Sequence, residues 1–327
     1  MTPRGSRVTA ATASLVMSAG AALPLAARIQ GGRPPTPWPQ LAAFCPAATM
    51  TATGALVLAV AARSRRTAVV AAAVLLPLVL SGVLPVPGRV APPVDHRESD
   101  GLPATGTFTV MTVNAFLGQA DADDIVAVAR EHGVDLLAVQ ELTPALQARL
   151  ETAGLGSLLP HRHDEPLPGA SGAGLWSRYP LDPVPAVEGM GFVAPRALVR
   201  LPSGPAVTVT CAHPLAPRPG ADRRWADDLE RLREELAAAT GPQLVAGDLN
   251  AGRDHAAFRA LLDTGLVDAA EAGHRFGPHT WPSRLALVHL DHVLVSPGAL
   301  APVSAATLRI AGTDHRAVVT RLGYREP

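Results

Sequence analysis

The distribution of charge along the chain constrains its fold more than any other feature. All 28 acidic residues of the 327-residue sequence lie at Asp95 or later, whereas residues 1–90 contain eight arginines and no acid. Each uncharged stretch in this first part is close to or above the ~20 residues that a helix needs to cross a bilayer. We therefore predict a membrane region over residues 1–87. Its transmembrane helices, about three in number, are expected at about residues 8–27, 38–62 and 67–86.

The arginines predict how this region is oriented. Arg4 and Arg7 precede the first stretch, and a cluster at residues 63–66 separates the second from the third. Because basic residues favour the cytoplasmic side, we expect a multi-pass protein of the cell membrane with its large domain outside the cytoplasm. The first stretch could instead be a signal peptide, since the small residues at 25–27 would permit cleavage. Buried helices of a soluble protein would need a large partner core that no other segment supplies.

A proline-rich segment follows the apolar region. Residues 85–106 contain five prolines and mixed charges without apolar periodicity. Such a composition is typical of an extended tether, and we predict a linker over residues 88–106. The two cysteines, Cys45 and Cys211, fall in a predicted membrane helix and a predicted strand, so we expect no disulfide between them.

The remainder of the chain alternates between short apolar runs and segments with helical spacing, such as residues 121–132 and 222–239. This alternation predicts an α/β fold. One apolar run ends in Gly247-Asp248-Leu249-Asn250, and period-2 alternation places Asp248 and Asn250 on the same face where the strand ends. By itself this motif is equally typical of an ordinary turn after a strand.

Similar polar residues stand at the ends of other apolar runs. Asn114, Glu141 and His213 each follow such a run, Asp291 opens one, and Asp314-His315 precedes the last. Taken singly, each could be a turn or solvated loop residue. An ordered series of acids, amides and imidazoles at strand ends instead indicates a site built at one rim of a sheet.

Together these stretches resemble the endonuclease/exonuclease/phosphatase superfamily, whose fold is that of deoxyribonuclease I, and the chain resembles a membrane-anchored bacterial member of it. The resemblance implies a four-layer sandwich of two packed mixed β-sheets flanked by helices, with the catalytic domain at residues 107–327. The matching stretches occur in the order of the family: Thr112-Val113-Asn114, Val139-Gln140-Glu141, Trp176-Ser177-Arg178-Tyr179-Pro180, His213, Gly247-Asp248-Leu249-Asn250, Leu290-Asp291-His292-Val293 and Thr313-Asp314-His315.

The resemblance implies a hydrolase of phosphoester bonds that depends on Mg²⁺ or Mn²⁺. Glu141 is then the main metal ligand, with Asn114 beside it and Asp314 on the other side, since hard cations prefer oxygen ligands. The resemblance leaves open which of Asp248 and His315 acts as the base. The remaining roles follow the family pattern: His213 and Asn250 bind the phosphoryl oxygens, Asp248 positions or deprotonates the attacking water, Asp291 orients His315, and Arg178 contacts substrate.

The formal charge of the predicted catalytic region favours some substrate classes over others. Residues 91–327 contain 20 arginines and 28 acids, a formal charge of −8, whereas surfaces that bind duplexes usually carry excess basic groups. We expect a small phosphoester or a lipid headgroup as substrate, together with contact to the lipid bilayer, and we predict no protein partner. An extracellular nuclease of the same fold is the alternative, and a catalytically silent binding module is an alternative of another class.

Overall fold

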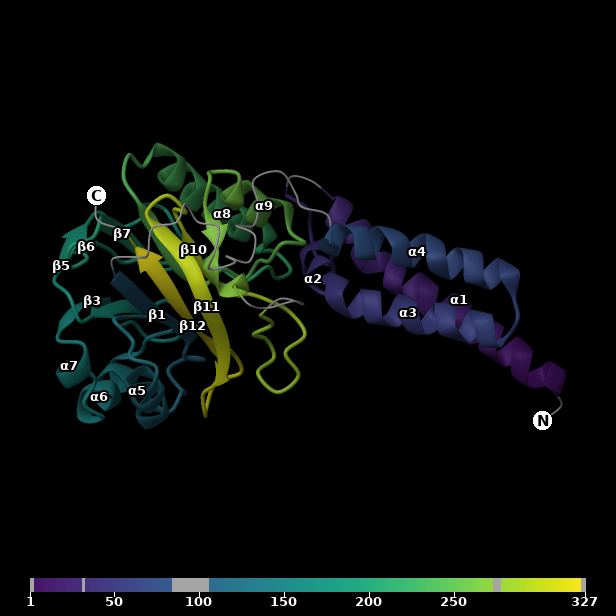
Figure 1. Ribbon diagram of the computed structural model, residues 1–327, viewed down its shortest axis with the longest axis horizontal. Helices are drawn as coiled ribbons and strands as arrows, with labels where there is room; N and C mark the ends of the chain where they lie inside the picture. Colours follow the sequence, from purple (N-terminus) through teal and green to yellow (C-terminus); the bar gives the residue numbers. More distant parts are fainter. Residues whose placement is uncertain (1–2, 31–32, 84–105, 273–277, 325–327) are drawn as a thin grey trace. The chain divides into compact units, whose positions relative to one another are not determined.

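The computed structural model describes residues 3–30, 33–83, 106–272 and 278–324 (Figure 1). The chain divides into a helical unit, over its first part, and an α/β unit. The predicted linker at residues 88–106 lies outside the described residues except for its last position, where the first strand begins.

The helical unit packs through small side chains. Ala52, Ala55 and Ala59 of α3 are fully buried, and the Ser14 hydroxyl of α1 donates a hydrogen bond to the Ala55 carbonyl, at 2.8 Å. Small residues let helix backbones approach closely. The four helices are α1 (Pro3–Ile29), α2 (Trp38–Ala43), α3 (Cys45–Ala61) and α4 (Arg65–Val83).

The prediction of about three transmembrane helices is wrong by length and composition. Among the described residues, one helix, Ser6–Ile29, is long and apolar enough to cross a membrane, and a signal sequence would pass the same test. The predicted helix at residues 38–62 is instead divided at Phe44, and its longer part, Cys45–Ala61, has 17 residues. Pro46 explains the division, because proline lacks a backbone N–H and is best tolerated in the first turn of a helix.

The first sheet of the α/β unit has six strands in the order β11-β12-β1-β2-β4-β3. Within it β1 and β2 are parallel, and the other neighbours are antiparallel. The strands are β1 (Gly106–Asn114), β2 (Leu136–Gln140), β3 (His161–Glu165), β4 (Ala173–Ser177), β11 (Leu300–Arg309) and β12 (Arg316–Tyr324).

The second sheet also has six strands, in the order β5-β6-β7-β8-β10-β9. Its one parallel pair is β7 and β8. The strands are β5 (Leu181–Val184), β6 (Arg196–Arg200), β7 (Ala206–Cys211), β8 (Gln243–Asp248), β9 (Val267–Asp268) and β10 (Asp291–Val295), and a short 3₁₀ turn, η1 (Ala269–Glu271), follows β9.

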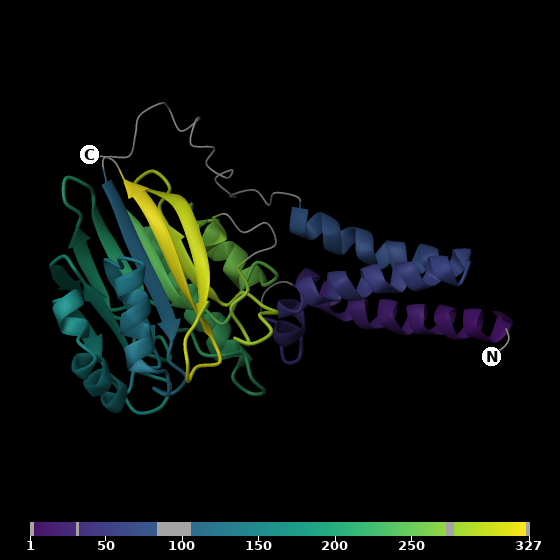
Figure 2. The same ribbon diagram turned by 60° about the horizontal axis from the view of Figure 1, so that its bottom comes forward.

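The two sheets pack face to face, and helices cover their outer faces (Figure 2). Phe108 and Leu244 are among the residues that fill the core between the sheets. On its outer face, each sheet packs against its own helices through a separate hydrophobic core. The first sheet is covered by α5 (Ala122–Glu131), α6 (Pro144–Thr152) and α7 (Leu155–Leu158), and the second by α8 (Asp222–Ala238) and α9 (Ala256–Leu262). The predicted α/β sandwich of two mixed sheets flanked by helices is confirmed.

Candidate active site

Two parallel strand pairs direct polar residues to one edge of the sandwich. Asn114, the last residue of β1, is paired with Gln140 of β2, so Glu141 follows at the same edge. In the second sheet β7 runs parallel to β8, which ends at Asp248, and His213 comes two residues after β7. Because parallel strands end at the same edge, each sheet contributes two of these four side chains.

Two antiparallel strands begin where those strands end. Asp291 is the first residue of β10 and is the register partner of Asp248. His315 immediately precedes β12, which runs antiparallel to β1. The hydroxyl of Thr313 joins the two ends by donating to the Asn114 carbonyl, at 2.7 Å. The topology therefore gathers residues that are as far apart in the sequence as Asn114 and His315, which are separated by 201 positions.

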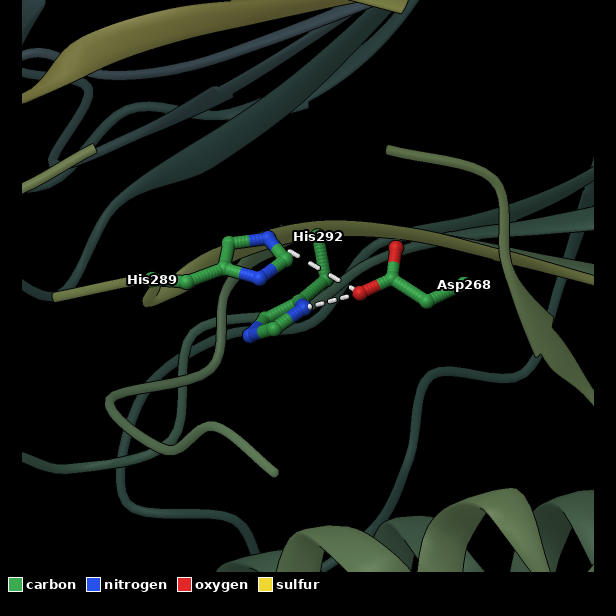
Figure 3. Close-up of side chains that lie close together, drawn as sticks. All are labelled: Asp268, His289 and His292. Atoms are coloured by element: carbon green, nitrogen blue, oxygen red, sulfur yellow. Dashed lines mark hydrogen bonds and ion pairs between the residues drawn. The ribbon is translucent and has the colours of Figure 1, made fainter. Parts of the chain in front are cut away.

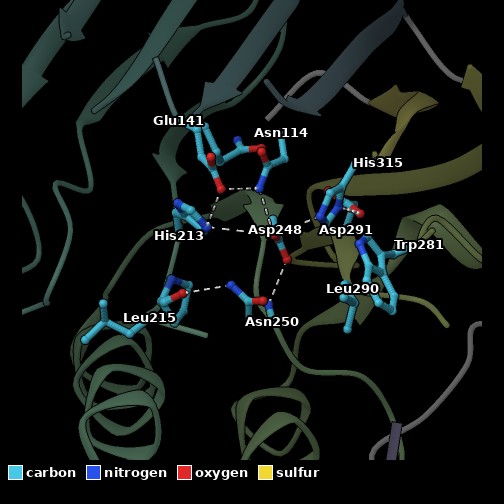
Figure 4. Close-up of polar contacts among 12 residues, drawn as sticks. Asn114, Glu141, His213, Leu215, Asp248, Asn250, Trp281, Leu290, Asp291 and His315 are labelled. Atoms are coloured by element: carbon cyan, nitrogen blue, oxygen red, sulfur yellow. Dashed lines mark hydrogen bonds and ion pairs between the residues drawn. The ribbon is translucent and has the colours of Figure 1, made fainter. Parts of the chain in front are cut away.

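The Asn114 amide links the carboxylates of the two sheets (Figure 4). Its Nδ2 donates to Asp248 Oδ2 at 2.9 Å and to Glu141 Oε1 at 3.1 Å. Its oxygen accepts from the Phe116 backbone N–H at 2.9 Å and so does not face Glu141. In this structure Asn114 orients two carboxylates rather than offering its oxygen beside Glu141.

The backbone at the strand ends adopts left-handed conformations that side chains disfavour. Glu141 has a φ of 56° and Asn250 a φ of 48°, and both Phe116 and Leu117 also have positive φ. Each such residue costs on the order of 1–3 kcal/mol unless its surroundings compensate. Here the compensation includes hydrogen bonds: Leu117 N–H donates to Glu141 Oε2 at 2.5 Å, and Asn250 N–H donates to Asp248 Oδ1 at 2.9 Å. Strain of this kind is common at functional sites.

Two imidazoles lie on either side of Asp248. The Nε2 atoms of His213 and His315 are each 3.7 Å from Asp248 Oδ2, and His213 Nε2 is also 3.9 Å from Glu141 Oε1. The ring of Phe192 packs against the His213 ring with centroids 5.0 Å apart. His213 Nδ1 is buried without a hydrogen-bond partner among the described residues. Both rings therefore direct a nitrogen toward the space beside Asp248.

The Asp291–His315 pair is held in a charged form. Asp291 Oδ2 lies 2.9 Å from His315 Nδ1, and Asp291 is fully buried. Burial alone lowers the pKa of His315, but the negative charges of Asp291 and Asp248 outweigh it and raise the pKa to about 10. Burial raises the pKa of Asp291 and the imidazole opposes this effect. Because two carboxylates face its two nitrogens, the proton belongs on His315, which is an imidazolium at neutral pH.

The side chains of the predicted residues Asn250 and Asp314 form hydrogen bonds to groups outside the cluster around Asp248. Asn250 Nδ2 donates to the Pro214 carbonyl at 3.1 Å, which ties the β8 exit to the segment after His213. Asp314 Oδ2 accepts from the Trp281 indole at 3.0 Å, while its Oδ1 is buried without a partner among the described residues. Asp314 thus keeps one carboxylate oxygen available.

Arg178, the predicted substrate contact, is not brought to this cluster. It follows β4, which is antiparallel to β2, so it lies at the start of β2, where its Nε is 2.8 Å from Asp135 Oδ1. Glu141 follows the other end of the five-residue β2. At about 3.3 Å per residue, the two positions are separated by roughly 16 Å or more. Arg178 acts as an ion-pair partner of Asp135.

The donor set fits a hard divalent cation. Glu141, Asp248, Asp291 and Asp314 bring four carboxylates to neighbouring strand ends, and one imidazolium, His315, offsets only part of that charge. Two carboxylate oxygens, one each on Asp291 and Asp314, are buried without partners among the described residues. Oxygen donors with excess negative charge are what Mg²⁺ and Mn²⁺ prefer.

Sequence reasoning did not identify three contributors to this site. They are the indole of Trp281, which binds Asp314, the backbone N–H of Leu117, which binds Glu141, and the ring of Phe192, which packs on His213. Trp281 and Phe192 lie in loops without periodicity, and a backbone amide has no sequence signature. Only their position in the folded chain assigns them to the site.

Comparison with protein families supports the same assignment. The model of the endonuclease/exonuclease/phosphatase family matches residues 111–315, which include every member of the cluster. No curated protein matches the chain.

Solved structures resemble the α/β unit at low sequence identity, so they bear on the fold alone. A humanized TDP2 from D. rerio has a TM-score of 0.53 at 14% identity and covers 66% of this chain and 99% of its own. A functionally unknown protein from Enterococcus faecalis V583 has a TM-score of 0.53 at 15% identity, covering 67% of this chain and 100% of its own. An endonuclease/exonuclease/phosphatase from Beutenbergia cavernae DSM 12333 has a TM-score of 0.50 at 20% identity, covering 67% of this chain and 72% of its own. The chain belongs to the endonuclease/exonuclease/phosphatase family.

Proposed function

We propose that the protein is a divalent-metal-dependent hydrolase of phosphoester bonds. One observation carries this proposal: strand ends from both sheets bring the amide of Asn114 and the imidazoles of His213 and His315 within 4 Å of the Asp248 carboxylate. The Glu141 carboxylate lies within 4 Å of two of these groups, Asn114 and His213. The family match supports the reaction class. When bound, the cation would polarise the substrate phosphate, and Glu141 would hold it with Asp314 and, after rotation of its amide, Asn114.

The hydrogen bonds and protonation states at the site favour Asp248 as the group that receives a proton from water. Both of its oxygens already accept hydrogen bonds, from Asn114 and from the Asn250 N–H, so its orientation is determined before substrate arrives. His315 is protonated at neutral pH because its pKa is about 10, and an imidazolium cannot act as a base. His315 is therefore better suited to donate a hydrogen bond to a phosphoryl or leaving oxygen.

The arginines of the α/β unit favour a small phosphoester or a lipid headgroup as substrate. At least five of the 20 arginines after residue 90 form ion pairs within the protein, which leaves fewer guanidinium groups to neutralise a nucleic-acid backbone. Those ion pairs are Arg162–Glu151, Arg178–Asp135, Arg196–Glu235, Arg200–Asp182 and Arg233–Glu230.

Nucleic acid is the second candidate substrate. Its support is the fold likeness to D. rerio TDP2 complexed with a single-strand DNA product, which has a TM-score of 0.52 at 13% identity and covers 67% of this chain and 99% of its own. A substrate panel that includes single-stranded DNA separates it from the first candidate.

The helical unit would attach the protein to a lipid bilayer. Thirteen of the seventeen large apolar side chains that are exposed among the described residues belong to it, including Leu15, Val57 and Val69. Large exposed aliphatic groups around a core of small residues suit contact with lipid chains. Retention in the membrane fraction after alkaline carbonate extraction is the expected result, and release into the supernatant would contradict attachment.

The function is tested with the full-length protein in detergent. The protein is incubated with a panel of substrates in the presence of Mg²⁺ or Mn²⁺, and again with EDTA. The panel contains bis-p-nitrophenyl phosphate, phospholipids, inositol phosphates, single-stranded DNA and plasmid DNA. We expect hydrolysis that requires the cation and falls by at least about 100-fold in Asp248→Asn and in Glu141→Gln.

A matched carboxylate outside the site provides the control. Asp123 is exposed on α5, and Asp123→Asn should keep the wild-type rate. Metal-independent hydrolysis, or equal rates in the Asp248 and Asp123 variants, would contradict the proposed reaction. A folded protein that does not bind the cation and does not hydrolyse any substrate of the panel would instead indicate a silent binding module.

A further inference from the structure

A second cluster of donor side chains lies on the other side of the Asp291 strand. Asp268 ends β9, His292 is the second residue of β10, and His289 lies just before β10 (Figure 3). One donor atom from each of these three residues lies within 4.8 Å of the other two. Asp268 and His292 are fully shielded from solvent at their side chains, and His289 is 11% exposed. The proposed hydrolase uses none of the three side chains.

The hydrogen bonds of His292 require a proton or another cation on each of its two ring nitrogens. Its Nε2 lies 2.8 Å from the Ala251 carbonyl, which can only accept, so Nε2 carries a proton. Its Nδ1 lies 2.7 Å from Asp268 Oδ2. A bare nitrogen lone pair would face a carboxylate oxygen at that distance, so a proton joins the two atoms here, and a metal ion could replace it once they move slightly apart. Donation of the second ring nitrogen to a carbonyl is also the usual arrangement of a metal-binding histidine.

His289 supplies a third donor toward the same carboxylate oxygen. Its Nε2 is 3.7 Å from Asp268 Oδ2, which is too far for a hydrogen bond but suits two ligands of one ion. The rings of His289 and His292 pack together with centroids 4.0 Å apart. Its Nε2 now faces the Asp291 carbonyl, which can only accept, so a transfer of the ring proton to Nδ1 would leave Nε2 with a lone pair to share.

We propose that Asp268, His289 and His292 bind a transition-metal ion such as Zn²⁺, separate from the hard cation of the hydrolase site. Two imidazoles and one carboxylate are a donor set for zinc rather than magnesium. With zinc–ligand bonds of about 2.0–2.1 Å, two ligands of a tetrahedral ion lie roughly 3.3 Å apart, so the 2.7 Å contact between His292 and Asp268 would lengthen and the 3.7 Å separation of His289 from Asp268 would shorten. To bind, His289 gives up the contact between its Nε2 and the Asp291 carbonyl, now 2.9 Å.

The test uses Co²⁺ as a spectroscopic probe and Zn²⁺ for stoichiometry. Full-length protein in detergent is stripped with EDTA, supplied with excess Mg²⁺ to occupy the oxygen-rich site, and titrated with either ion. We expect one bound ion per chain, visible ligand-field bands with Co²⁺, and a higher melting temperature with Zn²⁺. His289→Gln and Asp268→Asn should each weaken binding by about 100-fold or more, since even the loss of groups behind a ligand costs 10–100-fold.

Three matched variants locate the ion. Glu141→Gln and His315→Gln alter the hydrolase site and should leave Co²⁺ binding and its bands unchanged. His132→Gln changes an exposed imidazole at the end of α5 and should also have no effect. His289 is the least buried of the three ligands, and the melting temperature of its metal-free variant tells whether the fold is intact.

Three results would overturn the proposal. One is wild-type protein that retains no Zn²⁺ when Mg²⁺ is in excess, which would mean that a proton and not a metal ion joins Asp268 and His292. Another is a folded His289→Gln variant that binds Zn²⁺ and Co²⁺ as the wild type does, and the third is binding that disappears in His315→Gln. None of these results depends on the substrate, so the proposed hydrolase and this metal site can fail separately.

Discussion

Replacing Asp291 by asparagine isolates the charge that holds His315 protonated. The two side chains have nearly the same shape, so an asparagine oxygen could still accept from His315 Nδ1, now 2.9 Å from Asp291 Oδ2. The pKa of His315 is raised from 6.5 to about 10, and each pKa unit corresponds to about 1.4 kcal/mol. The imidazolium is therefore favoured in the folded protein by about 5 kcal/mol. Asp291 is the largest of the carboxylate contributions that raise this pKa, so we assign about half, 2–3 kcal/mol, to its charge.

The sign of the pH dependence follows from the direction of the shift. Because the folded-state pKa of His315 exceeds the unfolded value, its stabilisation is complete below about pH 6.5 and is lost as the pH rises through about 10. Asp291→Asn should therefore lower the free energy of unfolding by about 2–3 kcal/mol at pH 6. The difference should become small above about pH 10.5, where wild-type His315 is also neutral.

The assay is guanidinium unfolding of the full-length protein in detergent with EDTA, followed by tryptophan fluorescence at several pH values. His315→Gln provides the second arm of a double-mutant cycle. In that background the asparagine substitution should lower the free energy of unfolding much less, since no imidazolium remains to be stabilised. A penalty that is equal at pH 6 and pH 10.5, or equal with and without His315, would refute the charge argument and leave only a packing effect.

Three further predictions concern the core around the site. Burial raises the pKa of the Cys211 thiol to about 12, so iodoacetamide at pH 8 should leave Cys211 unmodified until the protein is denatured, as peptide mapping would reveal. Phe108 is fully buried between the sheets, and Phe108→Ala should lower the free energy of unfolding by about 3–5 kcal/mol in the same unfolding assay. A Cβ on Gly247 would lie 1.9 Å from the Ala212 carbonyl oxygen, so Gly247→Ala should cost more than about 3 kcal/mol and reduce hydrolysis, whereas wild-type stability would contradict the close approach.

The strand ends were predictable because the rules that place them are local. An apolar run that ends in a polar residue predicts where a strand stops, and parallel pairing brings the ends of neighbouring strands together. Those rules are sufficient for Asn114, Glu141 and Asp248. Antiparallel pairing then brings Asp291 opposite Asp248. Pairing order itself came from the family resemblance, since periodicity does not say which strands are neighbours.

Elsewhere, position in the sequence was a poor guide to position in the fold. Arg178 is next to a strand of the first sheet, but β4 runs antiparallel to β2, so its last residue, Ser177, pairs with Leu136 at the end remote from Glu141. The apolar stretch at residues 38–62 has the composition of one helix, yet Pro46 divides it. The left-handed backbone of Glu141 has no signature in the sequence, and the N–H that binds its side chain belongs to Leu117, which lies 24 residues earlier.

The hydrogen bond from Asn114 to Asp248 makes the geometry of the site depend on how the two sheets pack. Asn114 ends β1 of the first sheet and Asp248 ends β8 of the second, so this bond crosses the sandwich. Just inside it, Gln140 of β2 contacts the Cys211 sulfur of β7, at 3.2 Å, in a second crossing contact. A small displacement between the sheets would therefore lengthen the Asn114–Asp248 bond, and misplacement of a catalytic group by about 1 Å can cost 100-fold in rate. Substitutions such as Phe108→Ala that loosen the core between the sheets should thus lower the rate even at temperatures where the protein remains folded.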